Sequence, residues 1–121
     1  MTHSRLTIGR QGEELAAAHL QAQGLTIVAR NVSLTTGELD LVAKDGGTLV
    51  FVEVKTRSST AFGSPLAAVT GRKQAKLIQV AQEYLLLEQG GADVACRFDV
   101  VGVLLTSPPL IEHIAGAFAL S

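Results

Sequence analysis

The sequence has 121 residues, of which 47% are hydrophobic and 17% charged, and its formal net charge at pH 7 is −1. This is the length of one ordinary domain, spanning residues 1–121, with enough apolar residues to bury a core. The near-neutral charge excludes a global attraction to nucleic acid or anionic membranes. A polyanionic partner would therefore need a local basic patch or bound metal ions.

Cysteine content and the N-terminus indicate the cellular compartment. Cys96 is the only cysteine, so the chain can form neither an internal disulfide nor a zinc cluster built on cysteines. Residues 1–12 lack the apolar centre of a signal peptide, and no run approaches the roughly 18 apolar residues of a membrane span. We expect a cytoplasmic protein with no membrane partner.

A first helix is expected from about Thr7 to Gln23, because alanine and leucine dominate there and Gly24 is a natural C-terminal stop. At 100° per residue, Glu13 falls on the apolar arc of this helix, together with Leu6, Ala16, Ala17 and Leu20. An acidic residue on a packing face is either paired within the structure or directed at a functional site. Both interpretations stay open.

Three strands are expected next, at residues 25–33, 38–44 and 48–56. The first is broken by Asn31, and its Arg30 is either solvated or directed at phosphate. The second and third flank an Asp-Gly-Gly turn, which is typical of a hairpin.

The hairpin carries four charged side chains. Side chains alternate along a strand, so Glu38 and Asp40 share one face of the second strand, and Glu53 and Lys55 share one face of the third. If the register sets Asp40 opposite Glu53, these groups converge beside an apolar sheet and require a cation, a hydrogen-bond network or a metal ion. Carboxylate oxygens suit Mg²⁺ or Mn²⁺. The register therefore decides whether the hairpin holds a metal site.

The chain after the hairpin offers basic residues for substrate contact. Residues 58–65 are polar, contain glycine and proline, and are expected to form a loop directly after Lys55 and Arg57, where substrate contacts are common. A second helix is expected from Leu66 or Thr70 to Gln89. Its first turns carry cations that either bind phosphates or are simply solvated, namely Arg72, Lys73 and Lys76.

Two further strands complete the expected fold, at residues 93–106 and 110–114. Asp99 within the first is either an additional metal ligand or a hydrogen-bonded acidic residue. His19 and His113 lack metal-ligand spacing to each other. The element order is α-β-β-β-α-β-β in a single α/β domain.

Several motifs, in this order, resemble the PD-(D/E)xK superfamily of restriction-endonuclease-like proteins. They are GEELA around Glu13, GELDLVA around Asp40, FVEVKTR around Glu53 and Lys55, and the later helix RKQAKLIQVAQEYL. The closest resemblance is to the YraN-like family of small bacterial proteins, from about Gly9 to Phe118. The chain is also similar to archaeal Holliday-junction resolvases.

The resemblance implies a central mixed sheet flanked by helices and a metal site in its middle. Asp40 and Glu53 would be ligands of Mg²⁺ or Mn²⁺, together with the backbone carbonyl of Val54. Lys55 would orient or activate the attacking water or stabilise charge on the phosphate. Glu13 matches the helix glutamate that completes the site in resolvase-like members, and Gln74 matches a polar residue on the later helix. The proline of the signature is absent, because Leu39 precedes Asp40.

The function implied is a metal-dependent nuclease that hydrolyses DNA phosphodiester bonds, including those of branched or processed DNA. Arg30, Arg57, Arg72, Lys73 and Lys76 are the expected nucleic-acid contacts. The alternative is a non-catalytic nucleic-acid-binding or adaptor protein that keeps the nuclease fold. Junction-cutting enzymes pair two active sites, so a homodimer also stays open.

Overall fold

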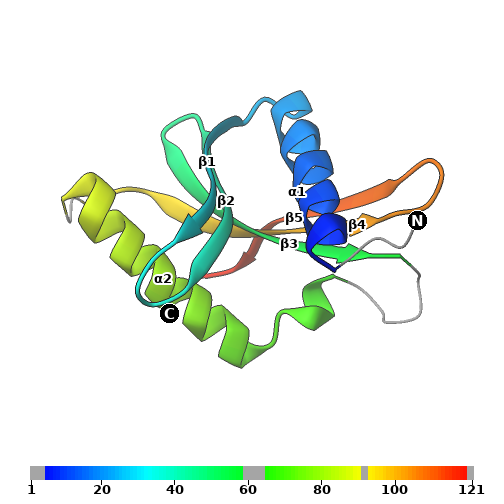
Figure 1. Cartoon of the computed structure of the whole chain (residues 1–121). Coiled ribbons are helices and arrows are strands. Elements are labelled where there is room, and N and C mark those ends of the chain that lie inside the picture. The colour runs from blue at the N-terminus through cyan, green and yellow to red at the C-terminus, as the bar shows by residue number, and fades with distance from the viewer. Residues whose placement is uncertain (1–4, 59–64, 91–92, 120–121) are drawn as a thin grey trace.

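The computed structural model describes residues 5–58, 65–90 and 93–119, which form a five-stranded sheet with two α-helices (Figure 1). The elements in chain order are α1 (Arg5–Ala22), β1 (Thr26–Ser33), β2 (Glu38–Asp45), β3 (Thr48–Arg57), the 3₁₀ helix η1 (Leu66–Ala68), α2 (Gly71–Gln89), β4 (Cys96–Leu104) and β5 (Leu110–Phe118). This confirms the α/β class and the order α-β-β-β-α-β-β, and it is compatible with a nuclease-like fold. Most of the loop expected at residues 58–65 lies outside the described residues, as does the side chain of Leu6.

The sheet is mixed, as expected. Its strands lie in the order β1-β2-β3-β4-β5, and every neighbouring pair is antiparallel except β3 and β4. The parallel pair is joined through α2, because parallel neighbours require a long crossover connection. β1 is not broken at Asn31, which instead takes a positive φ of 50° inside the strand. Asparagine tolerates this conformation better than most residues.

The two helices cover opposite faces of the sheet (Figure 1). On one face, α1 packs small side chains against aliphatic residues of β2, β3 and β4; this cluster includes Ala16, Ala17, Leu20, Leu41, Val50, Val52 and Val101. On the other face, α2 packs against a more aromatic surface that includes Leu39, Phe51, Val80, Ala81, Tyr84 and Phe98. The small residues let α1 approach the sheet closely.

Aromatic contacts extend the face under α2 to the last strand. The ring centroids of Phe51 and Phe98 lie 5.5 Å apart, and those of Phe98 and Phe118 lie 4.8 Å apart. Phe118 also pairs with Phe98 in the β4–β5 ladder. β5 therefore continues beyond the expected end at residue 114, because ring stacking holds its C-terminal half against β4.

Gly12 is where α1 comes closest to β3. A Cβ atom at this position would lie 1.8 Å from Thr56 Oγ1 and 2.7 Å from Thr56 Cβ. Only glycine fits this approach without a shift of the helix or the strand. Glu13 follows Gly12 directly, so the close contact also fixes how far Glu13 stands from the sheet.

The alanine variants of Gly12 and Gly9 are expected to change stability in opposite directions. Gly12→Ala should lower the free energy of unfolding by about 1–3 kcal/mol, because the added methyl group overlaps Thr56. Gly9→Ala should raise it by about 0.5–1 kcal/mol, because a Cβ there meets no atom within 4 Å and alanine favours a helix. Urea denaturation of both variants measures this. A similar effect at the two positions would contradict the close approach.

Candidate metal and nuclease site

The register of the hairpin brings Asp40 and Glu53 together. The β2–β3 ladder extends to the pair Leu41–Val52, and Asp40 and Glu53 are the next residues beyond it on the two strands. Asp40 Oδ2 accepts a hydrogen bond of 2.8 Å from the backbone N–H of Val54. The charge of Glu53 also acts on the carboxyl of Asp40. Both carboxylates therefore lie close enough to share one cation.

The electrostatics of Asp40 favour a compensating positive charge. Burial of its carboxyl, and then the negative charge of Glu53, raise its pKa from 3.8 to about 7. Glu13 adds to this effect, whereas the Val54 N–H and the charge of Lys55 oppose it. Asp40 is therefore costly to ionise beside Glu53, which is the setting in which a divalent cation stabilises two carboxylates.

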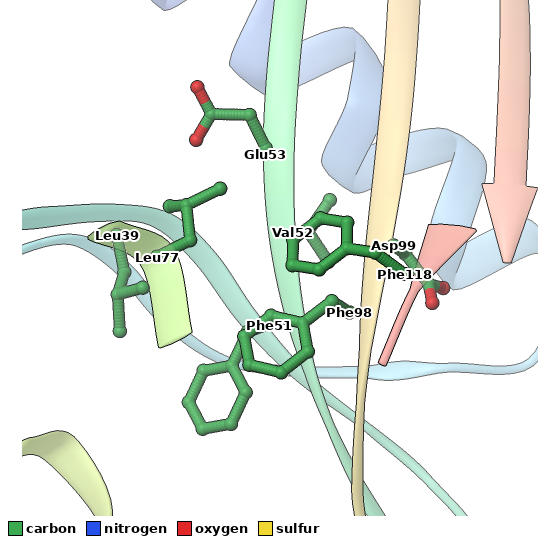
Figure 2. A pocket seen from close by; sticks show the side chains of 8 residues that line it. All are labelled: Leu39, Phe51, Val52, Glu53, Leu77, Phe98, Asp99 and Phe118. Atoms are coloured by element: carbon green, nitrogen blue, oxygen red, sulfur yellow. The ribbon is translucent and has the colours of Figure 1, made fainter. Parts of the chain in front are cut away.

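Glu53 and Lys55 project from the same face of β3 and form an ion pair, with Lys55 Nζ 3.1 Å from Glu53 Oε1. Their side chains are only 17% and 20% exposed, so water screens the pair less than it would at an open surface. Figure 2 shows Glu53 on β3 beside Leu77, with its carboxylate directed away from the ring of Phe51. The apolar packing under α2 thus ends at a charged pair.

Lys73 joins this pair from the first turn of α2. Burial would lower the pKa of Lys55, but its side-chain contact with Lys73 and the charge of Glu53 raise it. The same contact and the positive charge of Lys55 lower the pKa of Lys73. Lys73 is one of the expected nucleic-acid contacts, and the structure places it beside Lys55. The sequence could not show this, because the two residues lie on different elements.

Glu13 lies near the two hairpin carboxylates. Its pKa is raised by burial first, then by the charges of Glu38 and Glu53, and Arg10 opposes the shift. It lines a cavity of about 130 Å³ between α1 and the β1–β2 ladder; the other lining residues are Arg10, Glu14, Arg30, Asn31 and Leu41. Glu13 therefore lies close enough to Asp40 and Glu53 for their charges to interact, and both interpretations of Glu13 stay open.

A carboxylate on α2, Glu83, holds the turn that leads into β2. Thr35 Oγ1 donates to Glu83 Oε2, while the N–H and hydroxyl of Thr36 donate to Glu83 Oε1 at 2.9 and 2.7 Å. These hydrogen bonds lower the pKa of Glu83 to about 2. The turn precedes Asp40 by only a few residues, so Glu83 helps to position Asp40. No signal in the sequence pairs residues this far apart.

The other expected site residues lie on β1, β3 and α2. Gln74 Nε2 donates to the carbonyl of Val69 at 3.1 Å, so its amide supports the entry to α2. Lys76 extends along Gly37 of the β1–β2 turn, and Arg30 lines the cavity beside Glu13. Arg72 is exposed on the first turn of α2. Arg57 ends β3, where its carbonyl accepts from the Leu105 N–H.

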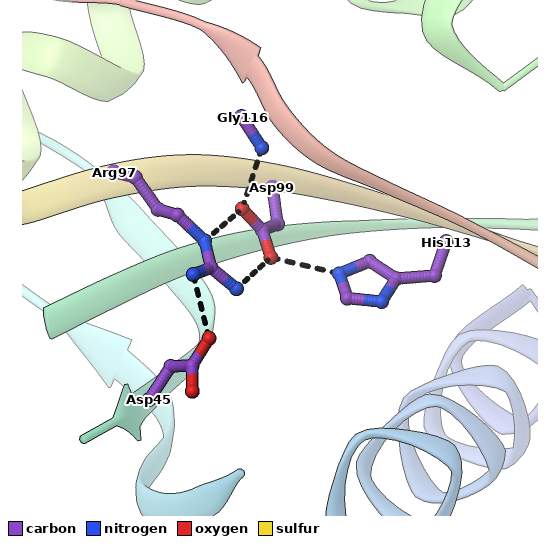
Figure 3. A network of polar contacts seen from close by, with 5 residues as sticks. All are labelled: Asp45, Arg97, Asp99, His113 and Gly116. Carbon is purple, nitrogen blue, oxygen red and sulfur yellow. Dashed lines mark hydrogen bonds and ion pairs between the residues drawn. The ribbon is translucent and has the colours of Figure 1, made fainter. Parts of the chain in front are cut away.

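Asp99 belongs to a separate, buried network (Figure 3). Its carboxylate is 0% exposed and accepts from Arg97 Nε at 3.0 Å, from Arg97 Nη2 at 3.2 Å and from the Gly116 N–H at 3.0 Å. His113 Nε2 lies 2.7 Å from its second oxygen. Both oxygens are engaged, which confirms the hydrogen-bonded interpretation and leaves no free position for a metal ion.

The donor set around Asp40 fits a hard divalent cation. Within the described ranges, no three or more His, Cys, Asp and Glu side chains gather into a ready-made metal cluster. The set available is two carboxylates, Asp40 and Glu53, with the Val54 carbonyl and water, and Mg²⁺ in proteins is commonly held by one or two carboxylates plus water.

In the described part of the chain, no helix is long and apolar enough to cross a membrane.

Comparison with known proteins identifies the family. Residues 12–103 match the model of the uncharacterised protein family UPF0102. The chain is 48% identical over 126 residues to a UPF0102 protein of Acidothermus cellulolyticus, covering 95% of this chain and 96% of the relative. It is 45% identical over 122 residues to one of Geobacter sulfurreducens, covering 99% and 94%. These names state no activity. The chain belongs to the UPF0102 family, which is the YraN family.

Proposed function

We propose that the protein is a Mg²⁺- or Mn²⁺-dependent nuclease that hydrolyses DNA phosphodiester bonds, including those of branched or processed DNA, in the cytoplasm. The observation that carries this proposal is the position of Asp40, which accepts from the Val54 N–H and lies near Glu53, while Lys55 pairs with Glu53 at 3.1 Å. Two carboxylates and a lysine on adjacent strands are the groups that metal-assisted hydrolysis requires.

Each residue of the proposed site has its own role in hydrolysis. Asp40, Glu53 and the Val54 carbonyl would hold the ion, which supplies Lewis acidity and positive charge when bound. Lys55, held by Glu53, donates a hydrogen bond to the attacking water or to a phosphoryl oxygen and stabilises the negative charge that develops there. The water oxygen forms a bond to phosphorus and gives up a proton, one ester P–O bond breaks, and the leaving oxygen takes up a proton. Lys73 lies beside Lys55, and this contact lowers the pKa of Lys73.

The basic residues around the site support a polyanionic substrate. Lys76 lies along the β1–β2 turn, and Arg30 lines the cavity beside Glu13. Phosphate contacts of this kind position a nucleic acid without reading its sequence. A four-way junction presents two scissile strands, so we expect the species that cleaves junctions to be a homodimer.

Cleavage assays with wild type and three variants test this proposal. Single-stranded, flapped and four-way DNA would be incubated with Mg²⁺ or Mn²⁺. Lys55→Met should reduce the cleavage rate by about 100-fold or more, because it removes a charged donor from the reacting phosphate. Glu53→Gln should reduce the cleavage rate to a similar extent. Glu88→Gln is the control, because it replaces an exposed carboxylate on α2, and it should leave the cleavage rate unchanged. Inert wild type on every substrate, or full activity of Lys55→Met, would refute the assignment.

The Glu53–Lys55 ion pair supports one alternative, a non-catalytic nucleic-acid-binding protein in which these charges neutralise each other. This alternative requires DNA binding that persists without divalent ions and in Glu53→Gln. Binding measured over a series of salt concentrations separates it from a protein with no nucleic-acid partner, because phosphate contacts weaken as salt rises.

A further inference from the structure

Asn31 lies at an irregular point of β1, directly beside the proposed metal centre. In the β1–β2 ladder Arg30 pairs with Leu41 and Val32 with Leu39, which leaves Asn31 opposite Asp40. Asn31 is the one non-glycine residue of the described chain with a positive φ, 50°. The backbone therefore departs from strand geometry at the residue that faces Asp40. Such conformations cluster at functional sites, where surrounding contacts hold them in place.

The side chain of Asn31 reaches Glu13 on α1. With its amide oriented as a donor, Asn31 Nδ2 lies 2.7 Å from Glu13 Oε2 and 3.1 Å from Glu13 Oε1. This orientation follows from chemistry, because an ionised carboxylate only accepts hydrogen bonds. Both residues line the cavity of about 130 Å³, so Glu13 is held in place while space for water or an ion remains next to it.

The register connects this contact to the hairpin carboxylates. Asn31 lies opposite Asp40 across the β1–β2 ladder, and Glu53 on β3 lies near Asp40. Glu13 lies close enough to these residues for its charge to act on Asp40 and for the charge of Glu53 to act on Glu13. A carboxylate that accepts from one amide keeps further lone pairs for a water molecule. Asn31 thus fixes Glu13 from the side facing β1.

We propose that Asn31 is a positioning residue that holds the Glu13 carboxylate toward Asp40 and Glu53, so that Glu13 binds a water molecule of their metal centre. The inference rests on the proposed function, because it concerns the same ion. Groups of the outer coordination shell fix the inner ligands in place, and their removal typically weakens metal binding 10- to 100-fold. At this residue of positive φ, the amide of Asn31 contacts Glu13 on α1.

Asn31→Gly is the variant that tests this role, because glycine keeps the positive φ without strain and removes only the amide. Calorimetric titration of the metal-free protein should give a dissociation constant for Mn²⁺ about 10- to 100-fold above that of wild type. The thermal unfolding midpoint without metal should not fall below that of wild type. Val28→Gly, the same replacement on an exposed residue of β1, should leave Mn²⁺ affinity unchanged.

A double variant shows whether Asn31 acts through Glu13. In a Glu13→Ala background, Asn31→Gly should cause no further loss of Mn²⁺ affinity, because coupled residues give non-additive effects. Equal Mn²⁺ affinity of Asn31→Gly and wild type, or fully additive losses, would overturn the inference and leave the proposed nuclease standing. Absence of both Mn²⁺ binding and cleavage in wild type would instead remove the proposed function, and the role of Asn31 with it.

Discussion

Replacement of Asp40 by asparagine is expected to stabilise the metal-free protein at pH 8, although it removes a proposed metal ligand. The folded protein raises the pKa of Asp40 from 3.8 to about 7, mainly through burial and then through Glu53. An acid whose pKa is raised by folding does not lower the free energy of unfolding below about pH 4, because the group is then protonated in both the folded and the unfolded protein. Stability then falls as pH rises from about 4 to about 7, because the unfolded chain releases its proton first.

The size of this effect follows from the shift. A change from 3.8 to about 7 corresponds to about 4 kcal/mol at most, so we expect Asp40→Asn to gain about 2–4 kcal/mol of unfolding free energy at pH 8 and little at pH 4. Asparagine keeps an oxygen that can accept from the Val54 N–H. Urea denaturation without divalent ions at both pH values measures the difference.

Glu38→Gln is the matched control for this experiment, because Glu38 is an exposed carboxylate two residues earlier on the same strand. Exposed substitutions of this kind usually change stability by less than about 0.5 kcal/mol. Identical stability of Asp40→Asn and wild type at pH 8 would show that ionised Asp40 does not destabilise the folded protein. Asp40 would then need no bound cation to compensate its charge.

Asp99→Ala is expected to be the most destabilising single change at a polar residue of the described structure. Burial alone would raise the pKa of Asp99, but hydrogen bonds from Arg97, the Gly116 N–H and His113 outweigh it and lower the pKa. Removal of the carboxylate leaves all three groups without their buried partner (Figure 3). Loss of one partner from a buried ion pair costs about 3–5 kcal/mol.

Asp45→Ala tests whether burial causes this effect, because Asp45 also pairs with Arg97, at 2.7 Å, but its side chain is 48% exposed. We expect a loss of only about 0–1 kcal/mol for Asp45→Ala. Thermal or urea unfolding of the two variants at pH 7 provides the comparison. Equal losses would contradict the view that the buried carboxylate organises the β4–β5 ladder.

Much of the fold could be predicted from the sequence, because local signals agree with it. Gly24 follows α1 closely, and the Asp-Gly-Gly turn lies between β2 and β3. The helix from Gly71 to Gln89 begins after Thr70, whose hydroxyl accepts from the Lys73 N–H, and ends at Gly90 with a φ of 62°. The full length of β5 was not predicted, because it depends on the stacking of Phe118 against Phe98 rather than on local sequence.

The candidate site could be predicted only in part. The alternation along β3 placed Glu53 and Lys55 together, and the ion pair is present as a consequence. The hydrogen bonds from the Thr35–Thr36 turn to Glu83 and the contact between Asn31 and Glu13 were not predicted. Both join residues on separate elements, so no spacing in the sequence reveals them. Asn31 looked like a strand break, whereas it lies within β1 with a positive φ and its amide contacts Glu13 on α1.

The most direct test of the metal site is a calorimetric titration of the metal-free wild-type protein with Mn²⁺, beside Asp40→Asn, Glu53→Gln and Glu88→Gln. We expect saturable binding to wild type, equal affinity in Glu88→Gln, and affinity at least about ten-fold weaker in the two hairpin variants, because each lacks one carboxylate ligand. Absence of Mn²⁺ binding to wild type, or equal affinity in all four proteins, would contradict a metal centre at Asp40 and Glu53.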